Sequence, residues 1–171
     1  MSKAVTITGF SSDITERDIS TTCEKIAGSI LTIKKFSCFA VVEFESSRLT
    51  NQLINLKLNE EPVKVYQRKY RGLNDLKYVL QVSNLPANTQ WKDLFNYIKY
   101  SGVVDNIFLS IDGTKADIIY TSIGYKKNAK TYLYLVPYTY KDANGETIEV
   151  KLEYVEDIDT VDDSNKRKRA Q

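Results

Sequence analysis

The chain has 171 residues, of which 42% are hydrophobic, which excludes a disordered chain and leaves room for one large domain or two small ones. It contains no histidine, and this removes the usual general base and a frequent zinc ligand. The 24 basic and 22 acidic residues give a net charge of +2, so any binding to a polyanion must come from local patches.

Motifs for nucleotide binding and catalysis are missing from the sequence. It has no Walker, dinucleotide-binding or GxSxG motif, so we expect no catalytic site, metal site, cofactor or small-molecule substrate. No apolar run is long enough to span a membrane, and MSKAVTITGF enters a strand-like pattern at once, so no signal peptide is expected. Cys23 and Cys38 are expected to be free, buried thiols.

Residues 1–67 have the hydrophobic pattern of a β-α-β-β-α-β unit. The predicted elements are a strand with Val5 and Ile7, a helix from Thr15 to Gly28, strands over residues 30–34 and 38–44, a helix capped by Ser46 or Ser47 and carrying Leu49, Leu53 and Leu56, and a strand with Val63 and Val65.

Residues 78–155 repeat this order. The predicted elements are a strand with Leu80 and Val82, a helix capped by Thr89 that ends near Gly102, strands over residues 104–109 and 116–120, a helix with Ala129 and Leu133 that stops at Pro137, a hairpin turn at Asn144-Gly145, and a last strand from Ile148 to Tyr154.

This repetition predicts an α+β protein with two ferredoxin-like sandwiches in tandem. In each one, helices should cover one face of the sheet and leave the other face open. A basic linker over residues 68–77 should separate the domains. Residues 156–171, acidic first and then basic, should form a disordered tail.

The stretch CFAVVEF, residues 38–44, resembles the longer strand motif of the RNA recognition motif (RRM) family, K/R-G-F/Y-G/A-F-V-x-F/Y. The resemblance puts Phe39 and Val41 at the two stacking positions of this strand and Thr6 at the aromatic position of the first strand. It implies that the Phe39 ring lies on the open face, where an RNA base can stack. Alternatively, the linker covers this ring.

Further candidates for RNA contact lie beside this strand motif. Lys64 and Tyr66 fall on the outward side of the fourth strand and could add a cation and a second ring. In the second unit, Asp117 takes a stacking position, so that face should be a poor platform for bases.

The second unit has another resemblance. QWKDLFN, residues 90–96, and the later Asp112-Gly113-Thr114 are similar to SWQDLKD and DGTG in the second, atypical RRM of SR and SR-like shuttling proteins. The resemblance implies contact with purine-rich RNA through Trp91, Lys92 and Asp93. Two alternatives remain: Trp91 fills the core, or the domain docks a protein.

Basic residues outside the sheets form three groups. Arg68, Lys69 and Arg71 of the linker could hold phosphates. Lys126, Lys127 and Lys130 are expected on a solvated helix face. The tail residues Lys166, Arg167, Lys168 and Arg169 resemble a nuclear import signal, although a nonspecific contact with a polyanion is the alternative.

The sequence therefore predicts a non-catalytic protein that binds single-stranded RNA, namely messenger RNA or its precursor. Its place would be nuclear processing, splicing or export, with shuttling to the cytoplasm left open. The alternative is a protein-interaction scaffold in a ribonucleoprotein whose sheets no longer bind RNA. Exposure of Phe39 and of the linker distinguishes the two, because RNA stacking needs them free.

Overall fold

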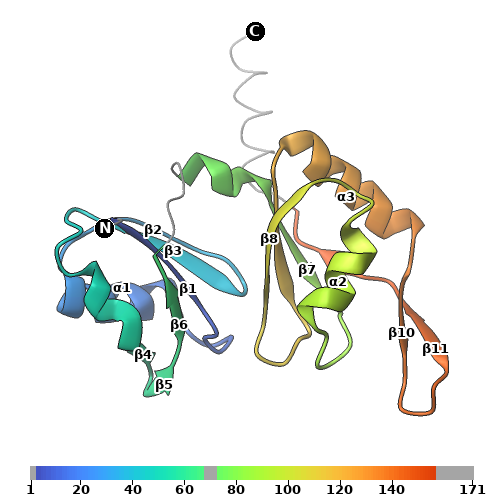
Figure 1. Cartoon of the computed structure of the whole chain (residues 1–171), viewed down its shortest axis with the longest axis horizontal. Coiled ribbons are helices and arrows are strands. Elements are labelled where there is room, and N and C mark those ends of the chain that lie inside the picture. Colours follow the sequence, from blue (N-terminus) through green and yellow to red (C-terminus); the bar gives the residue numbers. More distant parts are fainter. Residues whose placement is uncertain (1–2, 68–72, 157–171) are drawn as a thin grey trace, which may run out of the picture.

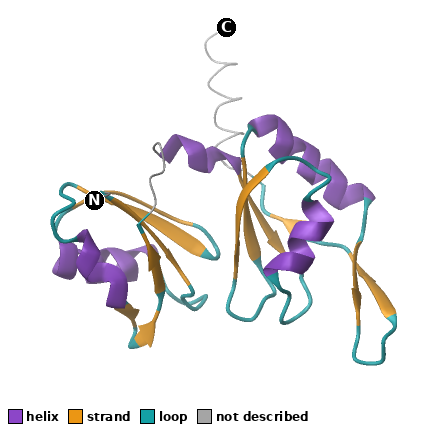
Figure 2. Cartoon of the chain, viewed as in Figure 1, coloured by secondary structure: helices purple, strands orange, loops and turns teal. Residues whose placement is uncertain are grey.

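The computed structural model of the chain describes residues 3–67 and 73–156. They form two α/β domains that lie side by side (Figure 1). In each domain the α-helices lie on the side of the sheet that faces away from the other domain (Figure 2). The predicted tandem of ferredoxin-like sandwiches is confirmed.

The first domain contains a sheet with the strand order β2-β3-β1-β6, in which all neighbouring strands are antiparallel. Its elements are β1 Ala4–Thr8, α1 Glu16–Ala27, β2 Ile30–Lys35, β3 Phe39–Phe44, the 3-10 helix η1 Thr50–Asn55, β4 Lys57–Leu58, β5 Glu61–Pro62 and β6 Lys64–Tyr66.

The second domain has the same arrangement, with the strand order β12-β7-β9-β8. Its elements are the 3-10 helix η2 Leu73–Tyr78, β7 Val79–Ser83, α2 Trp91–Ile98, β8 Val104–Leu109, β9 Ala116–Tyr120, α3 Ile123–Leu135, β10 Tyr138–Lys141, β11 Thr147–Val150 and β12 Glu153–Tyr154. This strand order is that of an RRM. The likeness of the domain to those of SR proteins stays a prediction, as do the domain boundaries at residues 67 and 78.

The predicted start and end of the first helix are confirmed by its caps. Thr15 Oγ1 accepts a hydrogen bond from Asp18 N at 3.1 Å, and Thr15 N donates to Asp18 Oδ2 at 2.9 Å. These bonds satisfy two N–H groups that the first turn leaves free. At the other end, Gly28 adopts φ +91°, which favours glycine. The helix buries Ile19 and Cys23 against the sheet.

The second helix of the first domain was predicted as an α-helix, and this was wrong. The segment forms η1, in which i to i+3 bonds such as Gln52 N to Leu49 O take the place of α-helical ones. No side chain caps its start, because Ser46 Oγ accepts instead from Arg48 N in a local turn. Leu53 still reaches the core.

Two predictions in the second domain also need correction. Thr89 does not cap α2: Gln90 is the N-cap residue, and Thr89 Oγ1 donates back to Pro86 O at 2.5 Å. The single last strand is in fact two strands. β11 pairs with β10 across the predicted Asn144-Gly145 turn, and only β12 joins the main sheet through β7.

Candidate nucleic-acid interface

An apolar cluster joins the two domains through the sheet faces that were expected to be open. The Phe39 ring stacks on Phe36 at 4.7 Å between centroids and on Phe108 of the second domain at 4.5 Å. We call this group the interdomain cluster; its members are Phe36, Cys38, Phe39, Val41, Leu76, Val79, Phe108 and Ile119. The loop between β2 and β3 points toward the second domain (Figure 1).

The expected platform for base stacking is therefore closed in this structure. Phe39 has 0% of its surface exposed and Val41 has 2%, so the expectation that they face solvent was wrong. The physical reason is that apolar rings gain more from packing on Phe108 and Ile119 than from contact with water. Whether Phe39 or Val41 ever contacts RNA stays a prediction.

The sequence contained a signal for this burial that its interpretation missed. Strands β3 and β9 carry apolar residues at consecutive positions, and nearly every residue of both is buried. Near-continuous apolar strands are typical of sheets covered on both faces. A strand with one open face would alternate between apolar and polar residues.

Two polar contacts accompany the cluster. Ser37 Oγ donates a hydrogen bond to Gln81 Oε1 at 2.8 Å, and Cys38 N donates to Asp117 Oδ2 at 2.6 Å. Asp117, which was expected to face solvent, is fully buried. Both bonds join the connection between β2 and β3 in the first domain to a strand of the second domain, to Gln81 in β7 and to Asp117 in β9.

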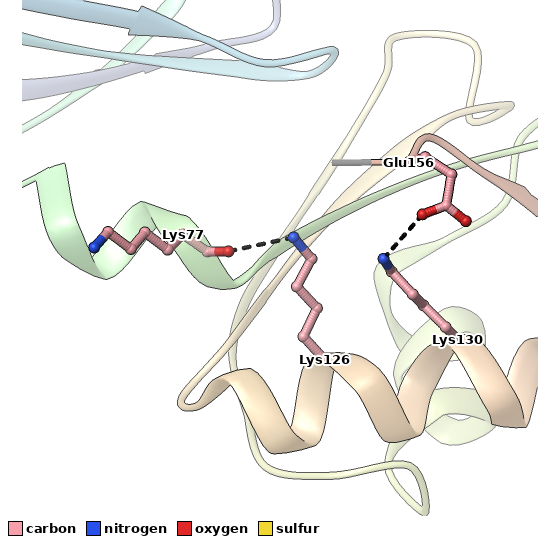
Figure 3. Close-up of polar contacts among 4 residues, drawn as sticks. All are labelled: Lys77, Lys126, Lys130 and Glu156. Atoms are coloured by element: carbon pink, nitrogen blue, oxygen red, sulfur yellow. Dashed lines mark hydrogen bonds and ion pairs between the residues drawn. The ribbon is translucent and has the colours of Figure 1, made fainter. Parts of the chain in front are cut away.

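A lysine from α3 holds the segment between the domains in place. Lys126 Nζ donates to the carbonyl oxygen of Lys77, at the end of η2, at 3.2 Å (Figure 3). Lys126 is only 2% exposed, which corrects its expected place on a solvated face. Lys130 pairs with Glu156 at 3.4 Å, while Lys127 is exposed as predicted. Because η2 contributes Leu76 to the interdomain cluster, this anchor supports the domain arrangement.

Beside the cluster lies a cleft of about 1130 Å³ between the two domains, which we call the interdomain cleft. Its walls come from β1, the β1–α1 loop and β6 on one side, and from β8 and the start of α2 on the other. It brings together the candidates Thr6, Lys64, Tyr66 and Trp91, and it adds Asn106 and Ile111, which the sequence analysis did not select.

One exposed aromatic ring stands on each side of this cleft. Tyr66 of β6 is 48% exposed and lies opposite Thr6 on the neighbouring strand. Trp91, the first residue of α2, is 49% exposed and stacks in parallel on Phe95 at 5.1 Å. The alternative that Trp91 fills the core is therefore wrong. Lys92 and Asp93 are exposed beside it.

The turn Asp112-Gly113-Thr114 determines where Trp91 stands. Asn88 N donates to Asp112 O at 2.8 Å, and a Cβ on Gly113 would lie 2.6 Å from Thr89 N. The turn thus packs against the loop that leads into α2. Hydrogen bonds from Thr114 and Ser110 to the Asp112 carboxylate lower its pKa to about 2 and stiffen the turn.

The charged residues that line the cleft are one cation, Lys64, and two carboxylates, Asp13 and Glu61, so these described charges sum to −1. Thr6 Oγ1 is buried in the cleft wall and has no hydrogen-bond partner among the described residues. Gln67 also lines the cleft. The next cations in the sequence, Arg68, Lys69 and Arg71, lie outside the described residues, as do Lys166 to Arg169 of the tail.

Within residues 3–67 and 73–156, no helix is long and apolar enough to cross a membrane. The same residues contain no group of three or more acidic or cysteine side chains placed to hold a metal ion. Cys23 and Cys38 are free thiols, as predicted, and both are buried.

Comparisons with known proteins complete this description. No family model matches the chain, and no curated protein matches it. Three similar solved structures are the Sxl-lethal protein in an RNA complex, the RNA-binding domain of Hrp1 with RNA, and the first two RRM domains of the yeast poly(U)-binding protein Pub1. The Sxl structure is 16% identical, covers 91% of this chain and 100% of its own, and has a TM-score of 0.42. For Hrp1 the identity is 14%, the coverages are 92% and 98%, and the TM-score is 0.47. For Pub1 the identity is 17%, the coverages are 90% and 99%, and the TM-score is 0.35. Because these identities and TM-scores are low, the assignment of the fold rests on the strand order of this chain and not on its likeness to these structures.

Proposed function

We propose that the protein binds single-stranded RNA in the interdomain cleft, without catalysing a reaction. The observation that carries this proposal is the pair of half-exposed rings, Tyr66 and Trp91, on opposite sides of one cleft. Bases stack on such rings whatever their sequence, and each stack contributes roughly 1–3 kcal/mol. A cleft of about 1130 Å³ has room for more than one base.

Phosphate contacts would come from the edge of the cleft. Lys64 is exposed there, and Arg68, Lys69 and Arg71 follow Gln67 directly in the sequence. Together with Lys64, these cations would neutralise the backbone of an RNA strand whose bases point inward. The likeness of the start of α2 to SR-type helices extends the proposal to Lys92 and Asp93 beside Trp91.

Fluorescence anisotropy with a short, mixed-sequence, labelled RNA tests this site. We expect Tyr66→Ala and Trp91→Ala each to weaken binding about 5- to 150-fold, as the loss of one stack predicts. Tyr134→Ala is the matched control, because this tyrosine is 72% exposed on α3 and does not line the cleft. No binding by the unaltered chain at low salt, or equal losses in all three variants, would contradict the proposal.

We extend the proposal to the cell: the RNA would be a messenger RNA or its precursor, in nuclear processing or export, with import directed by Lys166 to Arg169. The four adjacent basic residues support this extension. Replacement of all four by alanine should move a fluorescent fusion of the chain from nucleus to cytoplasm. Replacement of Lys126, Lys127 and Lys130 is unsuitable as a control, because Lys126 is structural; Lys3→Ala and Lys57→Ala, at exposed sites, serve instead.

The second candidate function is a protein-interaction scaffold, which the full burial of Phe39 favours. Exposed apolar side chains at the end of α3, Tyr134 and Leu135, would offer a surface for a protein partner. The same RNA titration separates the two functions: a chain that gives no response at low salt supports the scaffold.

A further inference from the structure

Asp117 occupies an unusual place between the two domains. It lies in the central strand β9, opposite Gln81 of β7 and Phe108 of β8, and none of its surface is exposed. Oδ2 accepts the hydrogen bond from Cys38 N of the first domain. Oδ1 is buried and has no hydrogen-bond partner among the described residues. A carboxyl group with one unsatisfied oxygen is costly to bury as an anion.

The surroundings of Asp117 favour its neutral form. Burial raises the pKa of this carboxyl to about 7, while the backbone N–H groups of Cys38 and Phe39 and the charge of Lys35 act in the opposite direction without cancelling the shift. Its strand neighbours Gln81 and Phe108 carry no charge. Burial and, second, the charge of Asp117 raise the pKa of the nearby Cys38 thiol; the charge of Asp112 also raises it, whereas that of Lys115 lowers it.

We propose that Asp117 is a positioning residue for the interdomain cleft, which holds the two domains together when its carboxyl is protonated and releases them when it is ionised. Three of the contacts that join the domains involve this carboxyl or its neighbours on the adjoining strands: the Cys38 hydrogen bond, the Ser37–Gln81 bond and the Phe39–Phe108 stack. Separation of the sheets would return the carboxylate to water and would expose Phe39.

The direction of the pH effect follows from linkage. The carboxyl has its raised pKa only in the closed form, and in the open form it should return toward the ordinary value of 3.8. The closed form therefore binds the proton more tightly, so closure is favoured at low pH and weakens as the pH rises from 3.8 to about 7. Each pH unit in this window lowers the ratio of closed to open chains by up to about tenfold, and above it the ratio is constant.

The pH dependence of RNA binding rests on the proposed function, whereas the pH dependence of domain closure does not. Tyr66 and Trp91 belong to different domains, so the cleft exists only while the domains are held in this arrangement. RNA bound between them should select the closed form. RNA affinity should then fall as the pH rises through the same window.

NMR of the full chain at pH 5.5 and pH 8 directly tests whether ionisation of Asp117 separates the domains. The apparent pKa of the Asp117 carboxyl, followed through its Cγ resonance, should lie above the ordinary 3.8 and no higher than about 7, because opening on ionisation pulls it below the value of the closed form. Residual dipolar couplings should give one alignment for both domains at pH 5.5 and separate alignments at pH 8. Asp117→Asn keeps the oxygen that accepts from Cys38 N and removes the charge, so it should keep one alignment at both pH values. Glu149→Gln, which removes an exposed carboxylate on β11, should behave like the unaltered chain.

Three outcomes would overturn the proposal: titration of Asp117 near pH 4, a common alignment of the unaltered chain at both pH values, or domain separation in Asp117→Asn at pH 8. Anisotropy with the labelled RNA at the same two pH values is the second arm. Domains that separate with pH in a chain that binds no RNA would support the role of Asp117 and contradict only the proposed function.

Discussion

The sequence marks two groups of aromatic rings as candidates for contact with RNA, and the structure shows that the groups differ in solvent exposure. Phe39 occupies the stacking position of the RRM-like strand, yet it is buried between Phe36 and Phe108. Tyr66 and Trp91 occupy an edge strand and a helix start, and half of each side chain is exposed at the interdomain cleft. The comparison teaches that the motif position alone does not make a ring available to a base; the packing of the second domain decides it.

The largest effect that would sharpen this comparison is expected from Phe39→Ala. Removal of a fully buried phenylalanine leaves a cavity and should reduce the free energy of unfolding by about 3–5 kcal/mol. Tyr66→Ala, at a half-exposed site, should cost less than about 0.5 kcal/mol. Urea unfolding of both variants measures the difference. Similar stability losses in the two variants would mean that Phe39 is not packed as described.

Phe39→Ala should also lower the affinity of the chain for RNA. The variant should weaken RNA binding even if no base touches Phe39, because the cleft loses its fixed walls. A weakened response alone is therefore no evidence for stacking on this ring. Phe39→Leu keeps most of the buried volume and removes the aromatic face, so near-normal RNA affinity in this variant would assign the role to domain packing.

A smaller effect is expected from Gly113→Ala, which tests how the exposed ring Trp91 is positioned. Gly113 has φ +75°, and an added Cβ would lie 2.6 Å from Thr89 N and 2.9 Å from Asn88 N. The backbone before α2 must shift, at a cost of about 2–3 kcal/mol in stability. RNA affinity should fall together with a change in Trp91 fluorescence. Gly145→Ala, also at positive φ but with no atom within 4 Å of the added Cβ, is the matched control.

The reactivity of the two cysteine thiols can distinguish opening of the interdomain cluster from unfolding of the first domain. Cys38 lies in the interdomain cluster and Cys23 in the core of the first domain. Phe108→Ala removes the stack on Phe39 and should favour opening by about 2 kcal/mol, so Cys38 should react with a thiol reagent about 30-fold faster. Cys23, whose pKa burial raises to about 12, should keep its slow rate. Equal acceleration of both thiols would indicate unfolding of the first domain instead of domain opening.

The sequence predicts the two sandwiches well, because each strand and helix is marked by local features such as the Thr15–Asp18 capping box and the Asn144-Gly145 turn. It fails where the structure depends on contacts between distant residues. The stack of Phe39 on Phe108 joins residues of different domains, and no local pattern specifies that pair. The consecutive apolar residues of β3 and β9 indicate burial on both faces, but they do not name the covering partner. The cleft is likewise a product of domain packing, although its rings Tyr66 and Trp91 were selected from the sequence.

The smallest expected effect concerns the charge beside the exposed rings. Lys64→Gln removes a cation from the cleft, where Asp13 and Glu61 already offset it, so affinity for RNA should fall by less than about 1 kcal/mol. If Lys64 contacts one phosphate, the slope of log affinity against log salt should fall by about 0.7. Lys57→Gln, on the exposed strand β4, controls for net charge. An unchanged slope in Lys64→Gln would mean that the rings bind bases there without help from this cation, and it would leave phosphate binding to Arg68, Lys69 and Arg71. The salt slope thus separates what the rings contribute from what the cations contribute at the same cleft.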